Sequence, residues 1–163
     1  SYWFVFQSPV LTKKGTDQFK YLIDHREEFI QSLGKQKVDD KLYAVYYNQL
    51  SYILKGYDKK STVEEVVNMK NEIRPFRLEK RKELSACIDI AEAYMKKDLK
   101  RLYTCCKKGF KLFHDDEAMN IAFPVLKYLK TERLQEDELQ KLVLVLEANI
   151  KDESLRKYIS SNM

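Results

Sequence analysis

Three cysteines, two histidines and eleven tyrosines are the residues of this chain with the most reactive or versatile side chains. The cysteines are Cys87, Cys105 and Cys106, and none belongs to the C-x-x-C pair of a thioredoxin-like redox centre. Neighbouring residues on a helix point about 100° apart, so Cys105 and Cys106 cannot easily form a disulfide with each other. We therefore expect the three thiols to fill a helix seam rather than to do redox or metal chemistry.

The histidines and acidic residues do not form the patterns of a catalytic or metal site. His25 and His114 lie far apart in the sequence, without the close Cys or His spacing of a zinc site. No glycine-rich nucleotide loop, nucleophile elbow or H-E-x-x-H motif is present. Short acidic runs suit helix starts or exposed faces; they lie at 27–28, 64–65, 115–117 and 136–138. The sequence thus predicts a chain that is not an enzyme and has no catalytic residue, metal ligand or cofactor.

The tyrosines and the basic residues point to recognition instead. Tyrosine combines an apolar ring with a polar hydroxyl, so it suits both helix seams and binding surfaces, and both interpretations stay open here. Residues 74–111 carry 12 Lys and Arg against 5 Asp and Glu, within a chain of net charge +5. Such a block can attract nucleic acid or anionic lipid, although a helical hairpin must also turn polar residues to solvent. The candidate interaction residues are Tyr43, Tyr46, Tyr47, Arg77, Arg81, Lys97 and Lys108.

The elements that must position these residues are predicted to be helices throughout. With 163 residues but only four glycines and three prolines, the chain suits one helical domain. No stretch reaches the roughly 20 apolar residues that span a bilayer. Ser61 and Glu64 form a candidate capping box, and Pro124 is expected to kink or divide a helix. The predicted helices cover 16–32, 38–54, 61–73, the hairpin within 84–113, a segment starting at 115–117, 136–149 and 153–159.

The stretch 84–113 predicts two helices joined by only a Lys-Lys-Asp turn. Apolar residues recur at three- and four-residue spacing on both sides of that turn, so the two helices must be antiparallel and share one seam. Gly109 is expected to lie in the seam. We predict an all-α fold of seven to nine helices in antiparallel hairpins, forming a short right-handed α-solenoid.

Residues 91–110 resemble the core of a tetratricopeptide repeat. Ala91 and Tyr94 match the first helix of that pattern, and Gly109 followed by Phe110 matches the small-then-large step of the second. The turn glycine customary in the family is absent before Asp98, and Leu102 replaces a customary small residue. The resemblance implies a degenerate tetratricopeptide-like array.

A second resemblance extends over more of the chain. Residues 18–29 and 34–46 are similar to the helical region that follows the thioredoxin-like domain in a group of bacterial thioredoxin-family proteins. This resemblance implies that residues 1–15 are the tail of an upstream thioredoxin-like domain and a linker, and that 16–163 form one helical domain. It also implies an envelope or secreted location, with the redox cysteines upstream of this chain.

The leading functional hypothesis is a non-catalytic module that binds a protein or peptide, with an acidic partner favoured by the basic block. The alternative is an accessory domain that positions substrate for a thiol–disulfide oxidoreductase. Nucleic-acid binding by 74–111 is the weakest candidate, because the basic residues are dispersed rather than gathered in one stripe.

Overall fold

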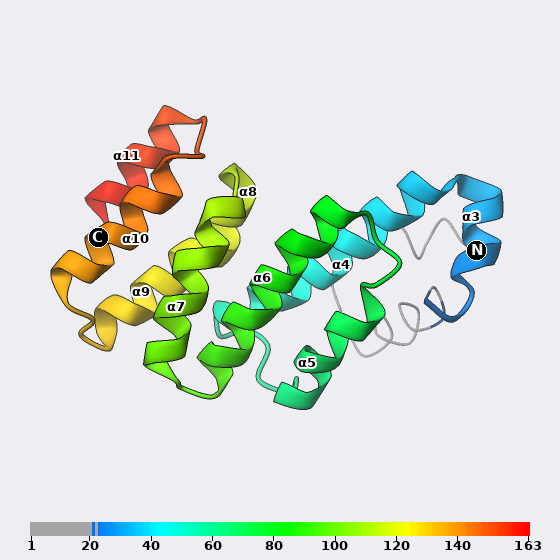
Figure 1. Ribbon diagram of the computed structural model, residues 1–163, viewed down its shortest axis with the longest axis horizontal. Helices are drawn as coiled ribbons and strands as arrows, with labels where there is room; N and C mark the ends of the chain where they lie inside the picture. The colour runs from blue at the N-terminus through cyan, green and yellow to red at the C-terminus, as the bar shows by residue number, and fades with distance from the viewer. Residues whose placement is uncertain (1–20, 22) are drawn as a thin grey trace.

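The helices form an elongated row with α3 and α4 at one end and α10 and α11 at the other (Figure 1). The computed structural model describes residues 21 and 23–163, and all regular structure in that part of the chain is helical. The predicted all-α class is therefore confirmed for these residues. The helices are α3 (Arg26–Leu33), α4 (Lys35–Leu54), α5 (Val63–Glu72), α6 (Leu78–Met95), α7 (Leu99–Gly109), α8 (Asp115–Glu117), α9 (Phe123–Thr131), α10 (Glu136–Glu147) and α11 (Glu153–Ser161), with a short 3₁₀ turn η1 (Phe110–Leu112) and a π-helical turn η2 (Ala118–Ala122).

Helix α6 is the central element of the packing. It contacts α4, α5 and α7, and with α7 it forms the antiparallel hairpin that the sequence predicts (Figure 1). Helix α4 contacts α3 on one side and η2 on the other, while α10 contacts α7, η1, α9 and α11. The degenerate tetratricopeptide-like array stays a prediction. The expected helix start at Thr16 or Asp17 and the expected tail over 1–15 lie outside the described residues.

The start of α5 differs by one residue from the predicted capping box. Thr62, not Ser61, is the N-cap: its hydroxyl accepts a hydrogen bond from the Glu65 N–H at 3.2 Å. Ser61 is engaged elsewhere, since its hydroxyl donates to the Asp58 carboxylate at 2.6 Å. The prediction of Ser61 and Glu64 was wrong because this local turn uses the first of two adjacent hydroxyl residues and leaves the second to cap the helix.

The helical backbone continues from α8 through η2 into α9, so Pro124 does not divide it in two, and the alternative expectation of a kink stays a prediction. Pro124 lies in the first turn of α9. A proline has no N–H to donate to the carbonyl four residues earlier, which here belongs to Asn120. The Ser51 hydroxyl of α4 donates to that carbonyl at 2.9 Å. A side chain from another helix thus satisfies the acceptor and ties η2 to α4.

Two helices end on non-glycine residues in the left-handed conformation. Lys97 after α6 has φ 56° and Arg133 after α9 has φ 63°, where Gly56 after α4 has φ 81°. The Asp98 N–H donates to the Ala93 carbonyl at 3.1 Å, a bond that closes the last turn of α6 as in a Schellman motif. Lys97 therefore occupies the position before Asp98 where the tetratricopeptide pattern has glycine. The left-handed conformation of a non-glycine residue reduces the free energy of unfolding by about 1–2 kcal/mol.

Gly109 lies at the closest approach of α6 and α7. It is buried, and a Cβ atom placed on it would lie 3.2 Å from Ile90 Cδ1 and 3.3 Å from Ala86 Cβ. Both contacts are tighter than ordinary van der Waals distance, so a methyl group requires a small shift of its neighbours, whereas a side chain larger than alanine requires the helices to separate. The expectation that Gly109 lies in the seam is confirmed.

We expect Gly109→Leu to destabilise the fold by about 1–3 kcal/mol through overpacking. Gly109→Ala should be close to neutral, because the helix propensity gained offsets the tight contacts of one methyl group. Lys107→Leu, at an exposed position of the same helix, controls for added apolar volume. Chemical unfolding measures all three variants. An unchanged midpoint for Gly109→Leu would mean that α6 and α7 do not meet there.

The two left-handed caps give a matched pair of substitutions. We expect Arg133→Gly to stabilise the protein by about 1 kcal/mol, because glycine adopts this conformation without strain. Lys97→Gly should increase the free energy of unfolding by less than Arg133→Gly does. The Lys97 ammonium lies 4.3 Å from the Tyr94 ring centroid and 5.0 Å from that of Tyr128, and these contacts would be lost. Thermal unfolding compares the two variants, and an equal gain would show that the ring contacts contribute nothing.

Candidate binding groove

A surface groove of about 590 Å³ runs between α6 and α7 and is bordered by α5. We call it the α6–α7 groove. Its uncharged lining residues are Ser85, Ala86, Thr104, Cys105, Gly109 and Leu112. All but Leu112 have small side chains, and we call these five residues its floor. Its charged lining residues are Lys70, Lys82, Asp89, Arg101 and Lys108.

Helical spacing brings these residues to one surface. On α6, Lys82, Ala86 and Asp89 follow one another at intervals of four and three residues, so they share one face. On α7, Arg101, Cys105 and Lys108 repeat the same spacing. The close seam at Gly109 places the two faces beside each other, and Lys70 of α5 completes the rim.

Two of the four cations in the groove are already paired within the protein. Lys70 forms an ion pair with Asp89. Arg101 donates to Glu92 Oε1 at 2.7 Å, while Lys96 donates to the other oxygen at 2.9 Å. The Lys96 ammonium, together with the Arg101 guanidinium, holds the pKa of Glu92 below its usual value of 4.5, so this carboxylate stays ionised.

Lys82 and Lys108 differ from the other two cations. Neither has an ion pair within 4.0 Å among the described residues. Both line the groove, Lys82 from α6 and Lys108 from α7. The groove thus presents two uncompensated positive charges from the two helices that enclose its small-residue floor, an arrangement that suits negatively charged groups.

Cys105 is the only cysteine with an accessible thiol among the described residues. Cys87 and Cys106 are fully buried, as expected for seam residues, whereas Cys105 is half-buried and lines the groove. Burial, followed by the nearby Asp89 carboxylate, raises the pKa of the Cys105 thiol, and Arg101 and Lys108 oppose that rise. The thiol is therefore protonated near neutral pH and is surrounded by the charged groups of the groove.

The three tyrosines expected at an interaction surface join α4 to its neighbours. The hydroxyls donate to three different elements: Tyr43 to Glu83 of α6 at 3.0 Å, Tyr46 to Glu72 of α5 at 2.6 Å and Tyr47 to the Asp116 carbonyl of α8 at 2.6 Å. Tyr46 is only 1% exposed. Burial raises the pKa of all three phenols well above their usual value, so they remain hydrogen-bond donors. The structure supports the packing interpretation that the sequence left open.

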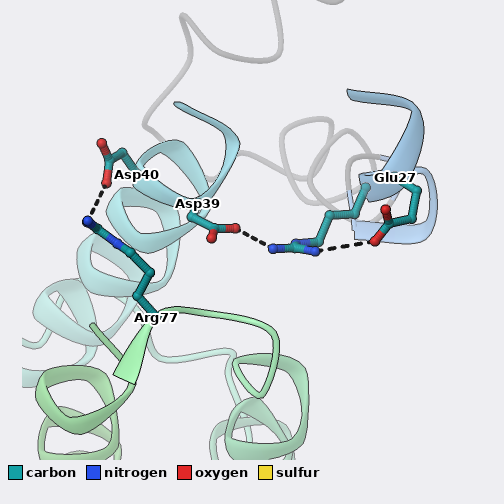
Figure 2. A network of polar contacts seen from close by, with 5 residues as sticks. Glu27, Asp39, Asp40 and Arg77 are labelled. Carbon is teal, nitrogen blue, oxygen red and sulfur yellow. Dashed lines mark hydrogen bonds and ion pairs between the residues drawn. The ribbon is translucent and has the colours of Figure 1, made fainter. Parts of the chain in front are cut away.

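The basic residues expected at the surface lie in four different environments. Arg77 is 3.5 Å from Asp40 of α4, and Figure 2 shows this pair beside the buried Asp39. Arg81 is half-buried, and its Nε has no hydrogen-bond partner among the described atoms. Lys97 lies over Tyr94 and Tyr128. Only Lys108 of the predicted residues lines the α6–α7 groove.

Sequence reasoning missed Lys70, Lys82, Asp89 and Arg101. The spacing of Lys82 with Asp89 and of Arg101 with Lys108 was a usable signal, because residues seven apart lie on the same helix face. Lys70 gave no such signal, since its place at the groove depends on how α5 packs against α6.

Comparisons with known proteins leave the family of this chain open: no protein-family model, curated protein or solved structure matches it. The similarity to the helical region of bacterial thioredoxin-family proteins therefore stays a prediction, as does the envelope location that it implies. In the described part of the chain, none of the helices combines the length and apolar character needed to cross a bilayer. The same residues contain no group of three or more His, Cys, Asp or Glu placed to hold a metal ion.

A separate acidic position on α8 makes stability depend on pH. Glu117 is 7% exposed. Burial, and secondarily the Glu83 carboxylate, raise the pKa of Glu117 above its usual value of 4.5, while His114 opposes the rise. A raised pKa in the folded state means that folding favours the protonated acid. Its contribution to stability is present below the ordinary pKa and is lost as the pH rises through the raised value.

We therefore expect Glu117→Gln to be more stable than the original protein at neutral pH, because it removes a buried negative charge. The advantage should shrink as the pH falls towards 4.5, where Glu117 becomes protonated. Glu132→Gln, the same substitution at an exposed position after α9, is the matched control. Urea unfolding across this pH range is the measurement. A Glu117→Gln variant that is less stable at every pH would show that the carboxylate is needed for packing.

Proposed function

We propose that this chain is a non-catalytic helical scaffold that binds an acidic segment of a partner protein in the α6–α7 groove. The observation that carries the proposal is that Lys82 and Lys108 have no ion pair among the described residues and line the groove beside its floor of small residues. Small side chains leave room for an extended peptide backbone, and the two ammonium groups attract carboxylates. The basic excess of residues 74–111 would draw such a partner towards the groove.

The wider setting is also a proposal. If the similarity to thioredoxin-family proteins reflects common ancestry, the module would follow a thiol–disulfide domain in the cell envelope and hold an acidic protein near it. The accessory, substrate-positioning role is then a special case of peptide binding, with the same groove and the same charges.

Fluorescence anisotropy with a labelled peptide of acidic and small polar residues tests the proposal. We expect binding that weakens with salt. Lys82→Gln with Lys108→Gln should weaken it about tenfold, since two exposed charge contacts are lost. Lys141→Gln with Lys151→Gln removes the same charge at exposed positions outside the groove, and should leave affinity nearly unchanged. Equal effects of the two double variants would show only a general charge attraction and would overturn the proposal.

A second readout locates the bound peptide. Cys105 lines the groove while Cys87 and Cys106 are fully buried, so a thiol reagent applied to the native protein should modify Cys105 first. The acidic peptide is expected to slow that modification, and Cys105→Ser should abolish the fast reaction. Unchanged modification at saturating peptide would place the binding site elsewhere. Tighter binding of single-stranded DNA than of the peptide, lost in the Lys82 and Lys108 double variant, would assign the groove to nucleic acid instead.

A further inference from the structure

The α6–α7 groove contains one acidic side chain among its cations. Asp89 projects from α6 and pairs with Lys70 of α5 across the rim. Side chains of the pair are partly exposed, 42% for Lys70 and 34% for Asp89. Because both groups face solvent, the pair itself contributes little to stability, and its main effect is on the charge that a ligand meets.

The pairing pattern fixes how many positive charges remain available to a ligand. Lys70 is neutralised by Asp89 and Arg101 is held by Glu92. Lys82 and Lys108 are left, and they come from opposite helices of the groove. A ligand with two neighbouring carboxylates can satisfy both lysines. A third carboxylate meets the Asp89 carboxylate, whose repulsion offsets the attraction of Lys70.

We propose that Asp89 is a specificity-determining residue: by neutralising Lys70 it restricts the groove to segments that present two adjacent carboxylates. The inference rests on the proposed function and adds to it a ligand class and the residue that selects it. Asp89 also lies close enough to influence the Cys105 thiol at the groove floor, so its charge is felt inside the groove and not only at its edge.

Fluorescence anisotropy at low ionic strength with three peptides tests the inference. The peptides share a neutral Gly/Ser background and carry one, two or three consecutive glutamates. For the original protein, affinity should rise by about threefold from one to two glutamates, since one exposed charge contact is added. It should change by less than about twofold from two to three. In Asp89→Asn the third glutamate should strengthen binding by about threefold to tenfold, because Lys70 is then available.

The charge-matched double variant separates this effect from a general gain of positive charge. Lys70→Gln with Asp89→Asn removes both members of the pair and leaves Lys82 and Lys108, so the limit at two glutamates should return. Lys70→Gln alone leaves Asp89 unpaired and should weaken all three peptides. Unfolding midpoints of each variant verify that the fold is intact, as expected for exposed positions.

The outcomes distinguish the two proposals. If no peptide binds the original protein, the proposed function fails. If the peptides bind through Lys82 and Lys108 while Asp89→Asn leaves the third glutamate without effect, only the role of Asp89 is overturned. Tighter binding of a peptide with one phosphoserine than of the two-glutamate peptide would show that the groove prefers a phosphoryl group. That result would overturn the proposed ligand class of paired carboxylates.

Discussion

Helices α6 and α7 approach each other closely because Gly109 has no side chain and faces Ala86, and most of the structure depends on this contact. Any Cβ at position 109 would lie 3.2 Å from Ile90. Helix α6 of this hairpin also packs against α4 and α5, and Ala86 and Gly109 of the seam line the groove. The residues that permit close packing on one side therefore also create the space that a ligand could occupy on the other.

Polar contacts, in addition to the apolar core that runs through the described helices, fix how α4 meets its neighbours. Tyr43, Tyr46 and Tyr47 direct one hydroxyl each to a different neighbour of α4, and Ser51 continues this docking at η2. A buried donor or acceptor without a partner costs about 1–3 kcal/mol, so such bonds select one arrangement among several of similar apolar burial. The tyrosines that suggest a binding surface in the sequence act here as connectors between helices.

The charge that the groove offers to a ligand depends on which of its charged side chains are already paired within the protein. Four cations and one carboxylate line the groove. Of these four cations, only Lys82 and Lys108 lack an ion pair with a described residue. A count of basic residues along the chain would overstate its attraction for anions, because internal partners neutralise part of the charge before any ligand arrives. A groove with only two cations free of an ion pair with a described residue favours selective binding of particular acidic segments. Non-selective binding of polyanions requires many such cations. This is the physical basis for preferring a protein partner to nucleic acid.

The sequence by itself determined the helical class, the α6–α7 hairpin and the place of Gly109 in the seam, since these depend on residue spacing and backbone chemistry within short segments. It could not distinguish Ser61 from Thr62 as a cap, because two adjacent hydroxyls compete and a nearby aspartate decides between them. Whether Tyr46 faces solvent or the core, and whether Lys70 and Asp89 meet, was decided only by the tertiary structure. Those contacts join different helices, and a helix pattern specifies which face is apolar but not which neighbour covers it. The groove is therefore a product of the packing of α5, α6 and α7 against one another.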